Sequence, residues 1–132
     1  MRVKRARPDD PLEWLNRARS NLARAKARIP EVYLEDLCFD AQQAAEKAIK
    51  AVLIAKKARF PYVHDITRLL TFLEESGVPV PKAIMDAEEL TPYAVAMRYP
   101  SSIEPVTEKH YKRALKLTER VVGWAEKQVA GR

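Results

Sequence analysis

The longest regular pattern of hydrophobic positions lies in residues 33–57. Apolar and small residues recur there at steps of three and four: Leu34, Leu37, Cys38, Ala41, Ala44, Ala45, Ala48, Ile49, Val52 and Leu53. This spacing places side chains along one face of an α-helix. The stripe is rich in alanine, which lets a neighbouring helix approach closely, and the segment contains no Gly or Pro. We therefore expect one long amphipathic helix at the centre of a bundle.

Helical patterns also occur on both sides of this segment. They run from Pro11 to Ile29, Ile66 to Ser76, Pro81 to Met97 and Glu108 to Val129. Asp10, Asp65 and Thr107 are suitable N-caps, whereas Pro30 and Gly77 are suitable stops. Because the turn after Pro30 is short, the first two helices should be antiparallel neighbours. The sequence predicts an all-α, up-and-down antiparallel bundle of about five helices.

Two irregularities interrupt these patterns. Thr91-Pro92 should kink or break the fourth helix, because proline cannot donate a helical hydrogen bond. Leu117 and Trp124 lie off the apolar stripe of the last helix. They widen its apolar face, which suits either a partner surface or a broad contact with the core.

The composition is that of one globular domain of 132 residues, with 47% hydrophobic and 32% charged residues. No apolar run is long enough to span a membrane and the N-terminus lacks a secretory segment, so we expect a cytoplasmic protein. Cys38 is the single cysteine, which excludes an intramolecular disulfide and a cysteine-based metal cluster. Its place on the apolar stripe indicates a small core residue rather than a reactive thiol.

The net charge of +6 is unevenly distributed. Residues 1–8 contain four basic residues and no acid, and we expect them to form a flexible basic arm. Residues 9–132, which we expect to form a single helical domain, contain 20 basic and 18 acidic residues. Affinity for nucleic acid would therefore have to come from the arm or from a local patch.

Arg98 is the first candidate functional residue, because it lies between Tyr93 and Tyr99 near the predicted helix break. A guanidinium beside aromatic rings suits a phosphate or a stacked base. The alternative is a structural arginine that bonds the last carbonyls of its helix or pairs with an acid across the bundle.

The polar face of the central helix is the second candidate. It comprises Asp40, Gln42, Gln43, Glu46, Lys47 and Lys50. Glu46 and Lys50 are four residues apart, and we expect them to pair on the surface. One interpretation is a solvated face, and the other is a binding surface that includes Gln43 and Lys47.

The two histidines are the last candidates. His64 precedes the predicted cap Asp65, where it could serve the cap, pack on its loop, or act as an acid or base if a reacting group lies beside it. No residue that could act with His110 in catalysis or metal binding lies at a characteristic spacing from it. The sequence contains no glycine-rich phosphate loop, nucleophile elbow or metal-binding spacing, so we expect no metal and no cofactor.

Four blocks of sequence occur in an order that resembles a known family. They are FDAQQAAEKAIKAVL at 39–53, HDI at 64–66, LTPYAVAMRYP at 90–100 and VVGWAEK at 121–127. Together they resemble the HEPN domain (higher eukaryotes and prokaryotes nucleotide-binding domain). The resemblance implies an all-α bundle that is usually a homodimer and that prokaryotes commonly encode beside a minimal nucleotidyltransferase, in a toxin–antitoxin arrangement. Active members are metal-independent RNases with four to six residues between an arginine and a histidine.

The chain departs from this RNase pattern. Eleven residues separate Arg98 from His110, whereas Arg59 and His64 have four residues between them but lie in the loop after the central helix. The resemblance therefore points to the subgroup with an RYP motif, and to a non-catalytic domain that binds a nucleotide, RNA or a nucleotidyltransferase partner. We expect the binding residues of this chain to be Arg98, Tyr93, Tyr99, Gln43 and Lys47.

The alternative function is a metal-independent endoribonuclease toxin. It would use Arg98 or Arg59 together with His64 or His110. RNA cleavage by such an enzyme requires one group to activate a ribose 2′-hydroxyl and another to stabilise the pentavalent phosphate. A histidine in the family's position is missing, which is why we favour binding over cleavage.

Overall fold

The computed structural model describes residues 6–7, 9–58, 62–94 and 105–131 of the chain. The described residues form an all-α structure in which no strand occurs. Its helices are α1 (Pro11–Lys26), α2 (Leu34–Ala55), α3 (Ile66–Glu75), α4 (Lys82–Met85), the 3₁₀-helix η1 (Asp86–Ala94) and α5 (Glu108–Ala130). The predicted fold class is therefore confirmed.

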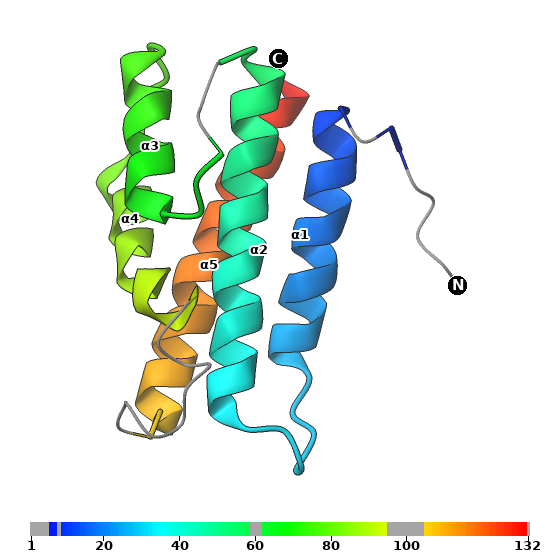
Figure 1. Cartoon of the computed structure of the whole chain (residues 1–132), viewed down its shortest axis with the longest axis vertical. Coiled ribbons are helices and arrows are strands. Elements are labelled where there is room, and N and C mark those ends of the chain that lie inside the picture. Colours follow the sequence, from blue (N-terminus) through cyan, green and yellow to red (C-terminus); the bar gives the residue numbers. More distant parts are fainter. Residues whose placement is uncertain (1–5, 8, 59–61, 95–104, 132) are drawn as a thin grey trace.

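The helices form an up-and-down bundle with α2 in the middle (Figure 1). The three long helices α1, α2 and α5 lie side by side. Helices α3 and α4 pack on the side of α2 and α5 that is opposite α1. Helix α2 contacts α1, α5, α3 and η1, so it is the element on which the others pack. None of the helices in the described part of the chain is long and apolar enough to cross a membrane.

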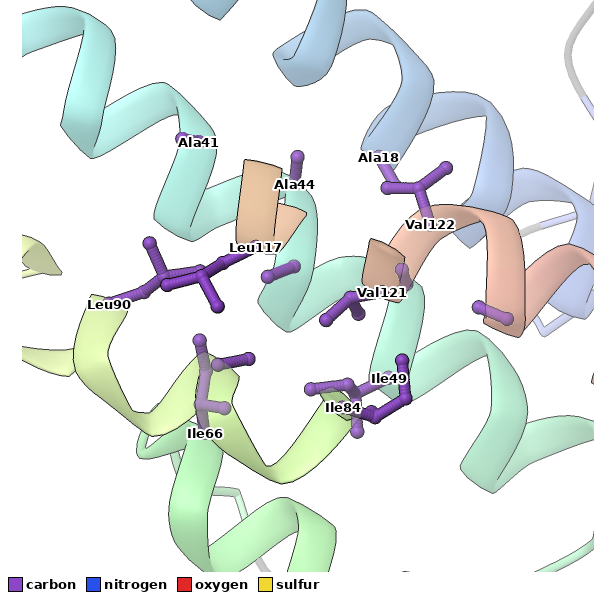
Figure 2. Packing of buried hydrophobic residues seen from close by; sticks show 14 of the residues in the cluster. Ala18, Ala41, Ala44, Ile49, Ile66, Ile84, Leu90, Leu117, Val121 and Val122 are labelled. Atoms are coloured by element: carbon purple, nitrogen blue, oxygen red, sulfur yellow. The ribbon is translucent and has the colours of Figure 1, made fainter. Parts of the chain in front are cut away.

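The alanine stripe of α2 lies in the core, as predicted. Ala41, Ala44, Ala45 and Ala48 are all fully buried. Ala41 and Ala44 belong to the same buried hydrophobic cluster as Leu90 and Leu117, which come from neighbouring helices (Figure 2). Thr118 of α5 donates a hydrogen bond of 2.8 Å from Oγ1 to the carbonyl of Ala41, which joins the two helices at this stripe.

The predicted N-caps are confirmed, although two helices differ from their predicted form. Asp10, Asp65 and Thr107 each accept a backbone N–H at the start of a helix. Helix α1 ends at Lys26 rather than Ile29, and Tyr111 of α5 donates a 2.6 Å hydrogen bond to the carbonyl of Ala25 in its last turn. Because this carbonyl has a partner, the helix does not need to continue to satisfy it.

The fourth helix is mostly a 3₁₀-helix. Only Lys82–Met85 are α-helical, and η1 continues through the predicted break to Ala94 with Pro92 inside it. Leu117, which lies off the predicted stripe of α5, is buried in the core together with Leu90 and Val121 (Figure 2). Leu117 therefore broadens the core contact and is not part of a partner surface, whereas Trp124 is partly buried against the core.

Candidate functional site on the polar face of α2

The polar face of α2 is largely buried, in contrast to the solvated face that one interpretation of the sequence predicts. Asp40, Gln42, Glu46 and Lys50 are all buried, and Gln42 has no exposed surface. Gln43 and Lys47 are half-buried. Buried polar and charged groups cost free energy unless they are hydrogen-bonded, so their partners are important here.

Glu46 is the centre of the first network of this face. Its Oε2 accepts a hydrogen bond of 2.9 Å from Lys50 Nζ and lies 2.9 Å from His64 Nδ1. Its Oε1 accepts a 3.2 Å hydrogen bond from the side-chain NH₂ group of Gln42. The side-chain amide oxygen of Gln42 in turn accepts a hydrogen bond of 2.7 Å from the side chain of Gln43. The predicted Glu46–Lys50 pair is thus present, but it is buried rather than on the surface, with the two residues only 3% and 4% exposed.

Aromatic rings surround the Lys50 ammonium. Nζ lies 5.8 Å from the ring centroid of Trp14 and 5.6 Å from that of Tyr62, distances at which cation–π attraction operates. Tyr62 also contacts the imidazole of His64 edge to face, with 5.2 Å between centroids. Tyr62 is 88% exposed and the side chain of His64 is 59% exposed, so this network reaches solvent at these two rings.

A second network joins α2 to α1, and we call it the α1–α2 network. It comprises Glu13, Arg17, Asn21, Arg24, Asp40 and Lys47. Asn21 Nδ2 donates to Asp40 Oδ1 at 3.1 Å, and Lys47 Nζ donates to Asn21 Oδ1 at 2.7 Å. Arg24 pairs with Asp40 at 3.3 Å, and Arg17 Nε donates to Glu13 at 2.8 Å.

The charge on Lys47 is disfavoured in the folded protein. Its pKa is lowered chiefly by burial and next by the positive charge of Arg17. Glu46 and Asp40 oppose the decrease in this pKa, and Arg24 adds to it. Lys47 therefore occupies a place where additional negative charge would be favourable.

The sequence profile described as the HEPN domain matches residues 12–128, which is most of the chain. The chain belongs to the HEPN domain family. Comparison with curated protein sequences gives no significant match.

Two solved structures resemble this HEPN domain closely. The crystal structure of TT1696 from Thermus thermophilus is 31% identical, with a TM-score of 0.78 over 89% of this chain and 97% of that chain. The crystal structure of ST0689, described as an archaeal HEPN homologue, is 25% identical, with a TM-score of 0.74 over 96% of this chain and 99% of that chain.

The sequence-predicted binding residues of this HEPN domain are only partly brought together. Gln43 and Lys47 lie one turn apart on α2, each in one of the two networks. Tyr93 lies near the end of η1, where burial, followed by the charges of Cys38 and Glu89, raises its pKa. No hydrogen bond or ion pair within the described ranges joins Tyr93 to Gln43 or Lys47.

Other predicted residues have a structural role or lie elsewhere in the chain. His110 completes a capping box at the start of α5, because its Nδ1 accepts the backbone N–H of Thr107 at 3.2 Å. Arg59, Arg98 and Tyr99 lie outside the described residues. Within the described part of the chain, no cluster of three or more His, Cys, Asp or Glu side chains is placed to hold a metal ion.

Asn21 is the residue that the sequence analysis missed. It lies three residues after Ala18 and four before Ala25, which places it on the buried stripe of α1. An asparagine on an apolar stripe needs a hydrogen-bond partner, and this signal could have identified a polar contact with α2. The sequence does not show that the partners would be Asp40 and Lys47.

Proposed function

We propose that this HEPN protein binds a nucleotide or RNA without cleaving it, at the polar face of α2. The observation that carries the proposal is the network around Glu46, which runs from the buried amide of Gln42 to the exposed rings of His64 and Tyr62. Exposed aromatic rings are the groups on which proteins stack unpaired bases. Gln43, half-buried on α2 and hydrogen-bonded to Gln42, offers an amide that can hydrogen-bond a base edge.

The state of the Lys50 ammonium favours binding over cleavage. RNA cleavage without a metal needs a proton acceptor and a cation that stabilises the pentavalent phosphate. Lys50 contacts the same carboxylate as His64, but it is buried and hydrogen-bonded to Glu46. A cation held in this way stabilises Glu46 rather than an incoming phosphate.

Titration of a short fluorescein-labelled RNA, followed by fluorescence anisotropy, tests the proposal, with ATP as a second ligand followed by calorimetry. Tyr62→Ala should weaken RNA binding by about 1–3 kcal/mol, the usual contribution of one stacked base. Tyr33→Ala is the matched control, because Tyr33 is 74% exposed in a different loop. Absence of binding to RNA and to ATP, or equal losses in the two variants, would contradict the proposal.

One contact favours the endoribonuclease as a second candidate function. His64 Nδ1 lies 2.9 Å from the buried carboxylate of Glu46, an arrangement that orients an imidazole and leaves its Nε2 edge for a substrate. Incubation of labelled RNA with the purified protein in EDTA tests this function. Cleavage that His64→Ala abolishes and His110→Ala leaves intact would establish it and overturn the non-catalytic proposal.

A homodimer and a minimal nucleotidyltransferase partner remain part of the proposal, on the basis of the family. Members of the family are usually homodimers, and prokaryotes commonly encode them beside a minimal nucleotidyltransferase in a toxin–antitoxin arrangement. Sedimentation of the purified protein would test the dimer. Co-expression with the product of an adjacent nucleotidyltransferase gene, where there is one, would test the partner, and the proposal fails on this point if the two proteins elute separately.

A further inference from the structure

The α1–α2 network contains one more cation than it has carboxylates. Arg17 pairs with Glu13, and Arg24 pairs with Asp40. Lys47 has a neutral partner, the amide oxygen of Asn21, and within the described residues no carboxylate lies within ion-pair distance of its ammonium. The network therefore has three positive and two negative side chains, and the unbalanced charge is that of Lys47.

The position of the Lys47 ammonium is fixed by Asn21. The NH₂ group of this amide donates to the buried carboxylate of Asp40, so the amide oxygen faces Lys47. The hydrogen bond to Asn21 uses one of the three N–H donors of the ammonium and leaves two. Lys47 is half-buried at the junction of the two helices, so part of its side chain is exposed to solvent there.

The two arginines of the network flank this ammonium. Arg17, Asn21 and Arg24 follow at steps of four and three, which places them on one face of α1 beside Lys47. Their side chains are about half-exposed or more, and each uses only part of its guanidinium in its ion pair. Seven residues of helix separate the arginines by roughly 10 Å along the axis.

We propose that Lys47, flanked by Arg17 and Arg24, binds successive phosphate groups of the ligand, either the backbone of an RNA strand or the chain of a nucleoside polyphosphate. This inference rests on the proposed function and names the chemical group recognised on the same face of α2, where that face meets α1. A single carboxylate would not reach both arginines, whereas successive phosphates could extend from one arginine past Lys47 to the other. The lowered pKa of Lys47 is consistent with this site, because a bound anion would raise the pKa again.

The test compares Lys47→Gln with Lys116→Gln, which removes the same charge from an exposed position on α5. Binding of the fluorescein-labelled RNA is measured at about 50 and about 200 mM salt. Lys47→Gln should raise the Kd about tenfold and reduce the slope of log K against log salt by about 0.7, whereas Lys116→Gln should change neither. Equal behaviour of the two variants would overturn the phosphate subsite and leave the proposed function intact.

ATP and inorganic pyrophosphate separate the possible sources of the phosphates. If Lys47→Gln weakens RNA binding alone, the ligand is a strand; if it weakens ATP binding alone, the ligand is a nucleoside polyphosphate. If the wild-type protein binds neither, the proposed function fails, and pyrophosphate becomes the probe. Saturable shifts of the Asn21 side-chain amide in NMR spectra, lost in Lys47→Gln, would then support the subsite alone, and their absence would overturn it.

Discussion

The imidazole Nδ1 of His64 lies 2.9 Å from Oε2 of Glu46, and the two residues are 18 positions apart in the chain. Lys50 donates to the same oxygen at 2.9 Å, so one carboxylate holds both an ammonium on its own helix and the segment that leads into α3. Gln42 donates to the other oxygen. The buried charge of Glu46 is therefore satisfied from three directions, and its removal should have large effects.

Glu46→Gln should lower the free energy of unfolding by roughly 3–5 kcal/mol, because it leaves the ammonium of Lys50 buried without a carboxylate. Urea denaturation followed by circular dichroism measures this loss. His64→Ala should cost much less, since its side chain is more than half exposed.

Glu126→Gln is the matched control for this prediction. Glu126 pairs with Arg19 at 2.6 Å on the surface, and the loss of an exposed pair costs at most about 1 kcal/mol. If Glu46→Gln and Glu126→Gln are equally stable, the buried Glu46–Lys50 pair contributes no more to the free energy of unfolding than an exposed pair does.

The sequence predicts most of the fold because local signals and burial agree in the long helices. Asp10, Asp65 and Thr107 each cap a helix as their residue types indicate, and the alanine stripe of α2 is buried. The early end of α1 was not predictable, because Tyr111, which binds the carbonyl of Ala25, comes from a helix 86 positions later. Tertiary contacts of this kind have no signature in a local pattern.

The site was harder to predict than the fold. Periodicity placed Gln43, Glu46, Lys47 and Lys50 on one face of a helix, but it did not show that much of this face is buried. The charges are buried because His64 and α1 supply hydrogen-bond partners, and sequence spacing does not show which residues meet across helices. Arg98, the main candidate from the sequence, lies outside the described residues.

Lys47→Met should change the stability at neutral pH little, because the cost of the partly buried charge and the hydrogen bond to Asn21 are lost together. The lowered pKa of Lys47 means that folding disfavours its charged form, so removal of the charge removes a cost. A methionine keeps the apolar part of the side chain packed between the helices. Thermal denaturation measures this effect, and a large decrease in Tm would show that Lys47 has a structural role.

The stability of Lys47→Met relative to the wild type should decrease as the pH rises. Between the lowered pKa of folded Lys47 and its ordinary value of 10.5, the unfolded chain binds more protons than the folded one. The wild-type protein therefore gains stability with pH in this window, relative to Lys47→Met. Urea denaturation of both proteins from neutral pH to about pH 10 tests the sign, and an increase in the stability of Lys47→Met relative to the wild type with rising pH would contradict it.

Cys38 should be unreactive in the folded protein. Its side chain is fully buried, and burial, followed by the charge of Glu35, raises its pKa from 9.0 to about 12. Only the thiolate reacts with iodoacetamide, so alkylation near pH 8 should occur only after unfolding. Mass spectrometry with and without denaturant checks this. Rapid alkylation of the folded protein would show that Cys38 is accessible.

The same shift in pKa makes Cys38 a source of alkaline instability. The unfolded thiol loses its proton near 9.0, whereas the folded thiol retains it up to about 12. The folded state therefore binds more protons in this window, and stability should decrease as the pH rises through it. The stability of Cys38→Ala should decrease less steeply with pH than that of the wild type. Parallel curves of stability against pH would contradict the raised pKa of Cys38.

The close packing of the alanine stripe leads to the last prediction. Ala44 is fully buried on α2, in the hydrophobic cluster that also contains Leu117, Val121 and Val122 of α5 (Figure 2). Ala44→Leu should lower the free energy of unfolding by about 1–3 kcal/mol, because the added carbon atoms force neighbouring side chains out of their preferred rotamers. Ala83→Leu is the control, since Ala83 is exposed on α4 and leucine is nearly as good a helix former as alanine. Urea denaturation of both variants measures the difference. If Ala44→Leu is as stable as Ala83→Leu, the helices around α2 are free to move apart, and its alanines do not set their spacing.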